Sequence, residues 1–336
     1  MRTTKKVSVI TTFYNASDFL LNAVDSVFQQ RNSRKDYTIE YVIVDDHSPD
    51  NSLEILNNYI STHQRKDLTW KIVTPEKNLG CGGARKFGIE NATGDYFMFL
   101  DADDYYMHID FIERAVDDIQ TNDADVVEYG VVYNQSNGQK TNSQAPQKMA
   151  LTNTHDIEMF MFRDNLIKFN VWSKIYKRVI VESHPYSDVR TFEDVRTIPL
   201  WLTHCLKLVI MPSCEINYRA AGNSIIRTNW VETRLGTISA IAELFPTFVN
   251  DYPLLKAMYT RSMIDIEALL SGKSSECEGF NEMSKLNTYM LSYLYPDKYK
   301  EMTYNLPEPE EEKTQEEKDE ERSKYIKTDL NSLPGM

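Results

Sequence analysis

Acidic side chains follow directly after a strongly apolar segment of this chain. Residues 96–100 (YFMFL) have the composition of a strand that is covered on both faces, and residues 101–104 (DADD) come next. In open parallel sheets ligands bind beyond the carboxyl ends of the strands, and hard divalent ions take carboxylate oxygens together with substrate phosphates. One of Asp101 and Asp103 would then hold a metal and the other a ribose. Because Asp also caps helices, a cap for a helix before Phe111 is the competing interpretation.

A second acidic pair, Asp45 and Asp46, follows the buried-strand pattern of residues 39–44 (IEYVIV). Parallel strands end at a common edge, so this pair is expected beside the first acidic motif. Asp46 would accept a hydrogen bond from a base or a sugar hydroxyl. The alternative is a helix cap beside Ser48.

A glycine-rich segment, residues 78–85 (NLGCGGAR), lies between the two acidic motifs. Glycines let the backbone approach a ligand closely, and a helix start offers free amides to anions, so a diphosphate would suit this loop. Arg85 adds a planar cation for phosphate or ribose oxygens. The segment matches neither the Walker pattern nor the dinucleotide fingerprint, and a tight turn is the alternative.

The elements that must position these motifs alternate between strand and helix patterns, which is typical of an α/β fold with a mainly parallel central sheet flanked by helices. Strands are expected over residues 7–12, 39–44, 70–73, 96–100, 124–133 and 208–211, and helices over 17–30, from 48, 83–91, 111–120, 154–163 and from 193. Residues 134–147 lack periodicity and are expected to form a loop. Beyond 229 the pattern is mostly helical to about 302, and a Glu- and Lys-rich stretch follows.

Bulk composition excludes some classes of function. The 336 residues carry a formal net charge of −13, which argues against nucleic-acid binding because phosphate contact needs a basic face. No apolar stretch is long enough to cross a bilayer, and the basic N-terminus leads into too short an apolar run for a signal peptide. The four cysteines are irregularly spaced and indicate no zinc site or disulfide framework. A cytoplasmic location is expected, with peripheral contact to a membrane left open.

Together these motifs resemble the family 2 glycosyltransferases of the GT-A fold. The resemblance rests on residues 9–15 (VITTFYN), 44–48 (VDDHS), 78–80 (NLG) with 83–85 (GAR), and 101–104 (DADD). It covers residues 5–225 and is strongest up to residue 110. It implies a Rossmann-like GT-A sheet. The mostly helical C-terminal extension is expected from the residue pattern beyond 229, where no family motif is recognised.

The resemblance also implies a role for each matching residue. Asp103 would hold Mn²⁺ or Mg²⁺. The family's acidic pair falls on Glu193-Asp194, after residues 172–176 (WSKIY), and Asp194 would be the general base. Uridine diphosphate is the expected carrier, and the donor would be bound by Thr11, Tyr14, Asp46, Asn78, Gly80, Arg85 and Asp101.

The implied activity is inverting transfer of a hexosyl or N-acetylhexosaminyl group from a UDP-sugar to a hydroxyl of a glycan, glycolipid or protein, in polysaccharide or glycoconjugate biosynthesis. Residues 1–228 would form the nucleotide-sugar-binding and catalytic domain, 229–304 a helical region suited to an oligomer interface, and 305–336 a disordered acidic tail. A nucleotidyltransferase that makes sugar nucleotides is the alternative, but it would need a glycine-rich loop directly after the first strand, where residues 11–15 read TTFYN. A non-catalytic binding protein would not need the full set of acidic and basic motif residues.

Overall fold

The computed structural model describes residues 4–33, 35–135, 138–162, 166–220, 230–248 and 250–271. All of them belong to the first of two units of the chain, Met1–Leu294. The predicted helix beyond residue 271 and the predicted acidic tail lie outside the described residues.

One sheet forms the centre of the described structure, with the strand order β3-β2-β1-β4-β9-β6-β10-β5. Neighbouring strands are parallel from β3 to β4 and again between β6 and β10, whereas β9 is antiparallel to both of its neighbours, β4 and β6. The main strands are β1 (Lys5–Phe13), β2 (Tyr37–Asp45), β3 (Leu68–Val73), β4 (Tyr96–Phe99), β6 (Val126–Gln135), β9 (Lys174–Lys177) and β10 (Leu208–Ala220). The mainly parallel sheet predicted from the apolar runs is therefore confirmed.

Three short strands extend this sheet. β5 (Tyr105–Tyr106) and β8 (Met149–Leu151) pair antiparallel with β10, and β7 (Lys140–Ser143) pairs antiparallel with β6. The prediction of a loop over residues 134–147 is wrong where β7 lies. Its polar side chains showed no alternation because most of them are exposed, so the pairing rests on main-chain hydrogen bonds.

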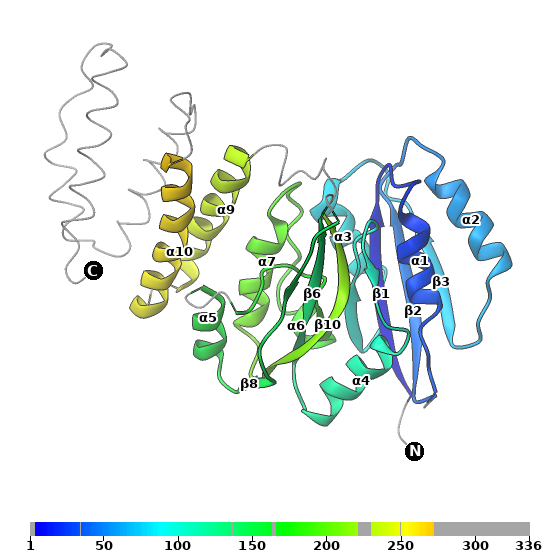
Figure 1. Ribbon diagram of the computed structural model, residues 1–336, viewed down its shortest axis with the longest axis horizontal. Helices are drawn as coiled ribbons and strands as arrows, with labels where there is room; N and C mark the ends of the chain where they lie inside the picture. The colour runs from blue at the N-terminus through cyan, green and yellow to red at the C-terminus, as the bar shows by residue number, and fades with distance from the viewer. Residues whose placement is uncertain are drawn as a thin grey trace, which may run out of the picture. The chain divides into compact units, whose positions relative to one another are not determined.

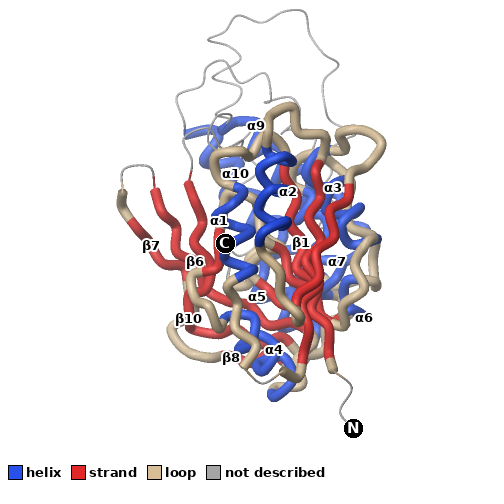
Figure 2. The backbone as a smooth tube through the Cα atoms, turned by 90° about the vertical axis from the view of Figure 1, so that its right-hand side faces the viewer, coloured by secondary structure: helices blue, strands red, loops and turns tan. Residues whose placement is uncertain are grey.

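Helices cover both faces of the sheet (Figure 2). α1 (Leu20–Phe28) and α2 (Ser52–Thr62) lie on one face, and α3 (Gly80–Glu90), α6 (Arg178–Val181) and α7 (Glu193–Leu202) lie on the other. α1 buries Leu20, Val24 and Val27 of the apolar residues whose helical spacing predicted it, whereas Leu21 is exposed. α4 (Phe111–Thr121) packs against β6 and β9, and α5 (Thr154–Phe162) against β8.

The chain beyond residue 229 is helical over its described part, as predicted. It comprises α9 (Trp230–Leu244), the 3₁₀ helix η1 (Phe245–Phe248) and α10 (Tyr252–Ser271). Ile238, Ile241 and Leu244 are buried, and α9 packs against α7 while α10 packs against α5 (Figure 1). Among the described helices, none combines the length and the apolar character that a membrane crossing requires.

Three helices begin elsewhere than predicted. α1 begins at Leu20 rather than at residue 17. α2 begins at Ser52 rather than Ser48, because the Ser48 amide donates to Asp45 Oδ1 (2.9 Å) and so closes a turn after β2. α3 begins at Gly80, so the glycines form its first turn rather than a loop before it. The parallel register brings Phe13 beside Asp45, and the Leu100 amide donates to Ile10 O (3.0 Å). The acidic motifs therefore follow strands that end at one edge of the sheet, as expected.

Candidate active site

The acidic motif after β4 forms a turn that leads into β5. The Asp104 amide donates to Asp101 O (3.1 Å), and the next helix, α4, begins only at Phe111 with Asp110 at its N-cap position. The turn is thus no cap for that helix. Ala102 is buried, and Asp101 and Asp103 on either side of it are partly exposed at the edge of the sheet.

The carboxylates of this turn perturb one another. Burial, and then the charge of Asp101, raises the pKa of Asp103 to about 6. Burial, and then the charges of Asp101 and Asp103, raise the pKa of Asp104 well above its usual range. Asp104 Oδ1 accepts the Arg219 amide (2.8 Å), whereas its buried Oδ2 has no hydrogen-bond partner among the described residues. Mg²⁺ and Mn²⁺ prefer carboxylate oxygens as ligands, and these carboxylates lack enough positive charge nearby to balance them. The turn therefore fits a divalent cation.

Arg85 joins this turn to a second acidic group. Its Nη2 lies 2.6 Å from Asp101 Oδ1, and its Nη1 donates to Glu193 Oε1 and lies 3.4 Å from the Tyr186 hydroxyl. Although burial opposes the charge, the carboxylates, Asp101 foremost, raise the pKa of the guanidinium above its ordinary value. Only 6% of the residue is exposed. The structure therefore uses both ends of the Arg85 fork to bridge two carboxylates.

Glu193 and Asp194 form the first turn of α7. Burial, and then the charge of Glu193, raises the pKa of Asp194 to about 7, while Arg85 acts in the opposite direction. A carboxyl group that titrates near neutrality is suited to accept a proton from a substrate hydroxyl. The general-base candidate thus lies next to the residue that Arg85 ties to Asp101.

Asp46 holds the first turn of α3. Its Oδ1 accepts the Leu79 amide (2.7 Å), its Oδ2 accepts the Gly80 amide (2.8 Å), and its carbonyl oxygen accepts the Asn78 side-chain amide (2.7 Å). A carboxylate at a helix N-terminus satisfies free amides and complements the helix dipole. Asp46, Asn78 and Gly80 are therefore brought together, as three of the predicted donor-side residues.

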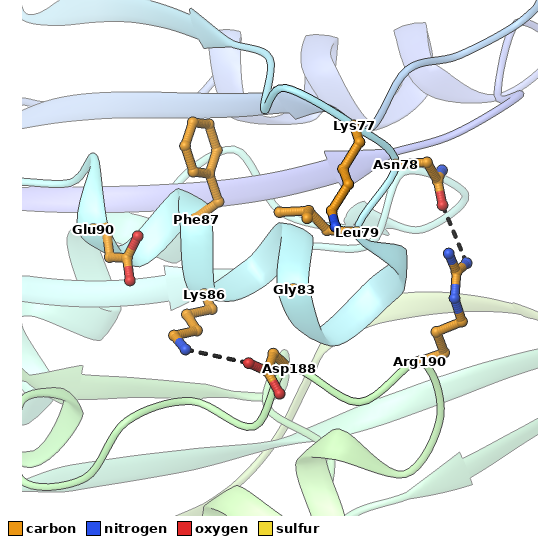
Figure 3. Close-up of a pocket in the computed structure, with 9 residues that line it drawn as sticks. All are labelled: Lys77, Asn78, Leu79, Gly83, Lys86, Phe87, Glu90, Asp188 and Arg190. Carbon is orange, nitrogen blue, oxygen red and sulfur yellow. Dashed lines mark hydrogen bonds and ion pairs between the residues drawn. The ribbon is translucent and has the colours of Figure 1, made fainter.

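Gly82 allows the segment before α7 to pack against this turn. A Cβ at Gly82 would collide with Val189 O and with Ser187 O, the latter at 2.5 Å, and would lie tightly against Glu193 Cβ at 3.0 Å. The same segment provides Arg190, which donates to Asn78 Oδ1 (3.1 Å), and Asp188, which pairs with Lys86 (Figure 3). These four side chains help to line an open pocket of about 490 Å³ along α3. Of the residues that line this pocket, only Asn78 belongs to the predicted site.

The remaining two predicted residues lie apart from these contacts. Thr11 is fully buried, and its hydroxyl is hydrogen-bonded to the Tyr41 hydroxyl at 3.0 Å. Tyr14, just after β1, is 55% exposed. Thr11 thus lies within the core below the edge, while Tyr14 presents its ring to solvent, where a ligand could reach it.

Sequence reasoning missed several of these partners. Glu193 was recognised only as the neighbour of Asp194, although its place in an acidic pair was a usable signal. Arg190 carried no signal, because it is an exposed cation outside any motif. The sequence of residues 101–104 also gave no sign that Asp104 is buried with one of its two carboxylate oxygens lacking a hydrogen bond from the described residues.

Comparisons with known proteins identify the family and the fold of this chain. The sequence matches the model of glycosyl transferase family 2 over residues 8–182. Glycosyltransferase GlyG of Streptococcus pneumoniae is 27% identical over 253 residues, which are 73% of this chain and 80% of GlyG. The crystal structure of S. aureus TarS 1–349 in complex with UDP-GlcNAc is similar with a TM-score of 0.66 at 17% identity, covering 86% of this chain and 81% of that one. The mannosyltransferase PcManGT from Pyrobaculum calidifontis, in complex with GDP-Man and Mn²⁺, has a TM-score of 0.53 at 15% identity and covers 87% of both chains.

The chain belongs to glycosyl transferase family 2, since the family model matches more than half of its 336 residues. Its fold is the GT-A fold of the glycosyltransferase structures above. Glycosyl transfer is accordingly the class of reaction it carries out. The predicted resemblance and fold class are both confirmed.

Proposed function

We propose that this protein transfers a sugar from a UDP-sugar to a hydroxyl acceptor with inversion at the anomeric carbon. The observation that carries the proposal is the bridge made by Arg85, which contacts Asp101 on one side and Glu193 on the other. It joins the turn expected to bind the donor to the acidic pair expected to activate the acceptor. The anomeric carbon of the donor would lie between them, with the leaving diphosphate on the side of the turn and the incoming hydroxyl on the side of the acidic pair.

The reaction is a single displacement. The acceptor hydroxyl gives its proton to the Asp194 carboxylate while its oxygen forms a bond to the anomeric carbon. The bond from that carbon to the diphosphate oxygen breaks on the opposite face, and UDP leaves. A bound divalent cation, with Asp103 as its ligand, would offset the charge that develops on the diphosphate. No covalent sugar–enzyme intermediate is needed.

Donor recognition would use the same edge of the sheet. Tyr14 offers an exposed ring for the base, and Asp101 keeps one oxygen free of Arg85 for a ribose hydroxyl. Asp46, with both carboxylate oxygens bonded to the start of α3, would act chiefly by fixing the shape of the donor site. The UDP-GlcNAc and Mn²⁺ complexes of the similar structures support this choice of donor and metal.

Further proposals concern the whole chain. Residues 1–228 would bind donor and catalyse transfer, residues 229–304 would form a helical region, and residues 305–336 an acidic tail. A role in polysaccharide or glycoconjugate synthesis, a cytoplasmic location and an oligomer through the C-terminal helices stay predictions from the sequence.

Calorimetry and product analysis test the proposal. With Mn²⁺ present, UDP is expected to bind and GDP to bind more weakly, and one UDP-sugar of a panel should be turned over with an inverted product. Asp103→Asn should lose metal-dependent UDP binding. Asp194→Asn should keep UDP binding and lose transfer.

Asp123→Asn is a charge-matched control, because this side chain is 92% exposed and precedes β6 at the opposite edge of the sheet. It should behave as the unaltered protein. Absence of UDP binding in the presence of metal would overturn the choice of donor. Full transfer activity in Asp194→Asn would remove Asp194 as the base.

A further inference from the structure

The helix α9, from the part of the chain beyond residue 229, touches the start of α7. Phe192, the N-cap residue of α7, has a left-handed backbone with φ of 59°. This conformation is uncommon for a bulky residue and persists only where the surroundings impose it. Glu193 and Asp194 follow immediately, so the direction of their side chains depends on how Phe192 is held.

The ring of Phe192 lies against Gly236 of α9. A Cβ at Gly236 would be 2.9 Å from Cζ of that ring and closer still to its Cδ2 and Cε2 atoms. Real Cβ atoms do not approach so closely, and protein interiors are too densely packed to absorb such an overlap without movement. Glycine at position 236 therefore lets the ring lie directly on the backbone of α9.

A second contact lies one turn further along α7 and two turns further along α9. Arg196 Nε and Nη2 each lie 2.7 Å from an oxygen of Glu243, which makes a bidentate ion pair. Arg196 also donates from its main-chain amide to Phe192 O (3.3 Å). Positions 192 and 196 share a face of α7, and positions 236 and 243 share a face of α9, so the two contacts fix the helices in register.

We propose that α9 positions the general base: Gly236 and Glu243 hold Phe192 and Arg196, and through them the first turn of α7 that carries Asp194. The inference rests on the proposed function, because it assigns Asp194 the role of base. It gives the C-terminal helical region a part in the reaction that the sequence did not predict. Gly236 and Phe192 are positioning residues, since they act through Asp194 and not on the substrate.

Gly236→Ala is the main test. Alanine is the better helix former, so without the contact to Phe192 this change would stabilise α9 and leave the reaction unaltered. If α9 positions the base, the added methyl group displaces the ring and the turn behind it. We expect the kcat of transfer to fall about 10- to 100-fold, the size of effect that a misplacement of about 1 Å produces. The Kd of UDP should stay within about twofold, because the described part of α9 packs against α7, α10 and η1, and the donor-side residues are on other elements.

Phe192→Leu and the double variant complete a cycle. Leucine leaves room for the new methyl group, so Gly236→Ala with Phe192→Leu should recover most of the kcat that Gly236→Ala alone loses. A wild-type kcat in Gly236→Ala would overturn the inference. So would a loss of the same size with Phe and with Leu at position 192.

Amide hydrogen exchange gives a readout that does not depend on activity. In Gly236→Ala the amides of the first turn of α7 should exchange faster, while those of the first turn of α3 should not change. Equal exchange in both proteins would refute the coupling of α9 to α7. If the unaltered protein transfers no sugar, the proposed function fails, and the exchange result still decides whether α9 holds this turn.

Discussion

Replacing Asp46 with asparagine tests how the first turn of α3 is held. The carboxylate accepts the Leu79 amide at 2.7 Å and the Gly80 amide at 2.8 Å, and only 3% of the residue is exposed. Asparagine has one acceptor oxygen, so its NH₂ group would face one of the two amides. A buried donor would then lose its partner, and the helix would lose a negative charge at its N-terminus.

The expected destabilisation by Asp46→Asn is the sum of these two losses. A hydrogen bond to a charged group contributes about 1.5–3 kcal/mol, and a charge at a helix end adds about 0.3–1 kcal/mol. We therefore expect Asp46→Asn to lower the free energy of unfolding by about 2–4 kcal/mol. Denaturation by urea, followed by tryptophan fluorescence, measures this change. UDP binding, measured by calorimetry, should weaken as well, because the turn supports the donor site.

Asp45→Asn is the matched control for this experiment. Asp45 is similarly buried, but among the described residues its carboxylate accepts one amide, that of Ser48 at 2.9 Å from Oδ1, and asparagine keeps that oxygen. Asp45→Asn should therefore lower the free energy of unfolding by less than about 1 kcal/mol. If Asp45→Asn and Asp46→Asn destabilise the protein equally, the two amide contacts of Asp46 do not hold α3 in the way the structure indicates.

Three further predictions concern the site. Arg85→Met leaves the Asp101 and Glu193 carboxylates without their buried cation, so the free energy of unfolding should fall by about 3–5 kcal/mol, and an unchanged urea midpoint would contradict the bridge. Transfer should rise as the pH increases through about 7, because Asp194 must lose its proton to act as the base, and a profile that is flat from pH 5 to 9 would exclude this role. The same raised pKa makes stability change in the opposite direction. The free energy of unfolding is highest at low pH, where Asp194 is protonated, and falls as the pH rises to about 7, because the buried carboxylate must then be charged. Tyr14→Ala should weaken UDP binding in calorimetry and change the free energy of unfolding by no more than about 0.5 kcal/mol, since the ring is exposed.

The parallel central strands and α1 could be predicted from the sequence because their signals are local. β4 is apolar throughout and buried, and the stripe of α1 repeats at helical spacing, so neither needs a distant partner to be recognised. The edge shared by Asp46 and Asp101 followed from the rule that parallel strands end together. These predictions needed only periodicity and strand direction.

The arrangement within the site could not be predicted in the same way. Arg85 was expected to face phosphate or ribose oxygens. Its partners within the protein, which the sequence did not indicate, come from the turn after β4 and from α7, 16 and 108 positions further along the chain. The glycines were expected to make room for a diphosphate, yet Gly82 makes room for the carbonyl of Ser187. Such choices depend on which segments meet in space, and no local pattern of residue types records that.

The close packing at Gly82 also bears on attempts to redesign the enzyme. Exchanging the segment before α7 for that of a relative would change the surroundings of the proposed base, Asp194. In this protein that segment rests on the bare backbone of the first turn of α3, so a graft with a different path would press on the turn that Asp46 holds. A successful chimaera would have to move residues 78–85 together with residues 186–194, as one matched pair of surfaces.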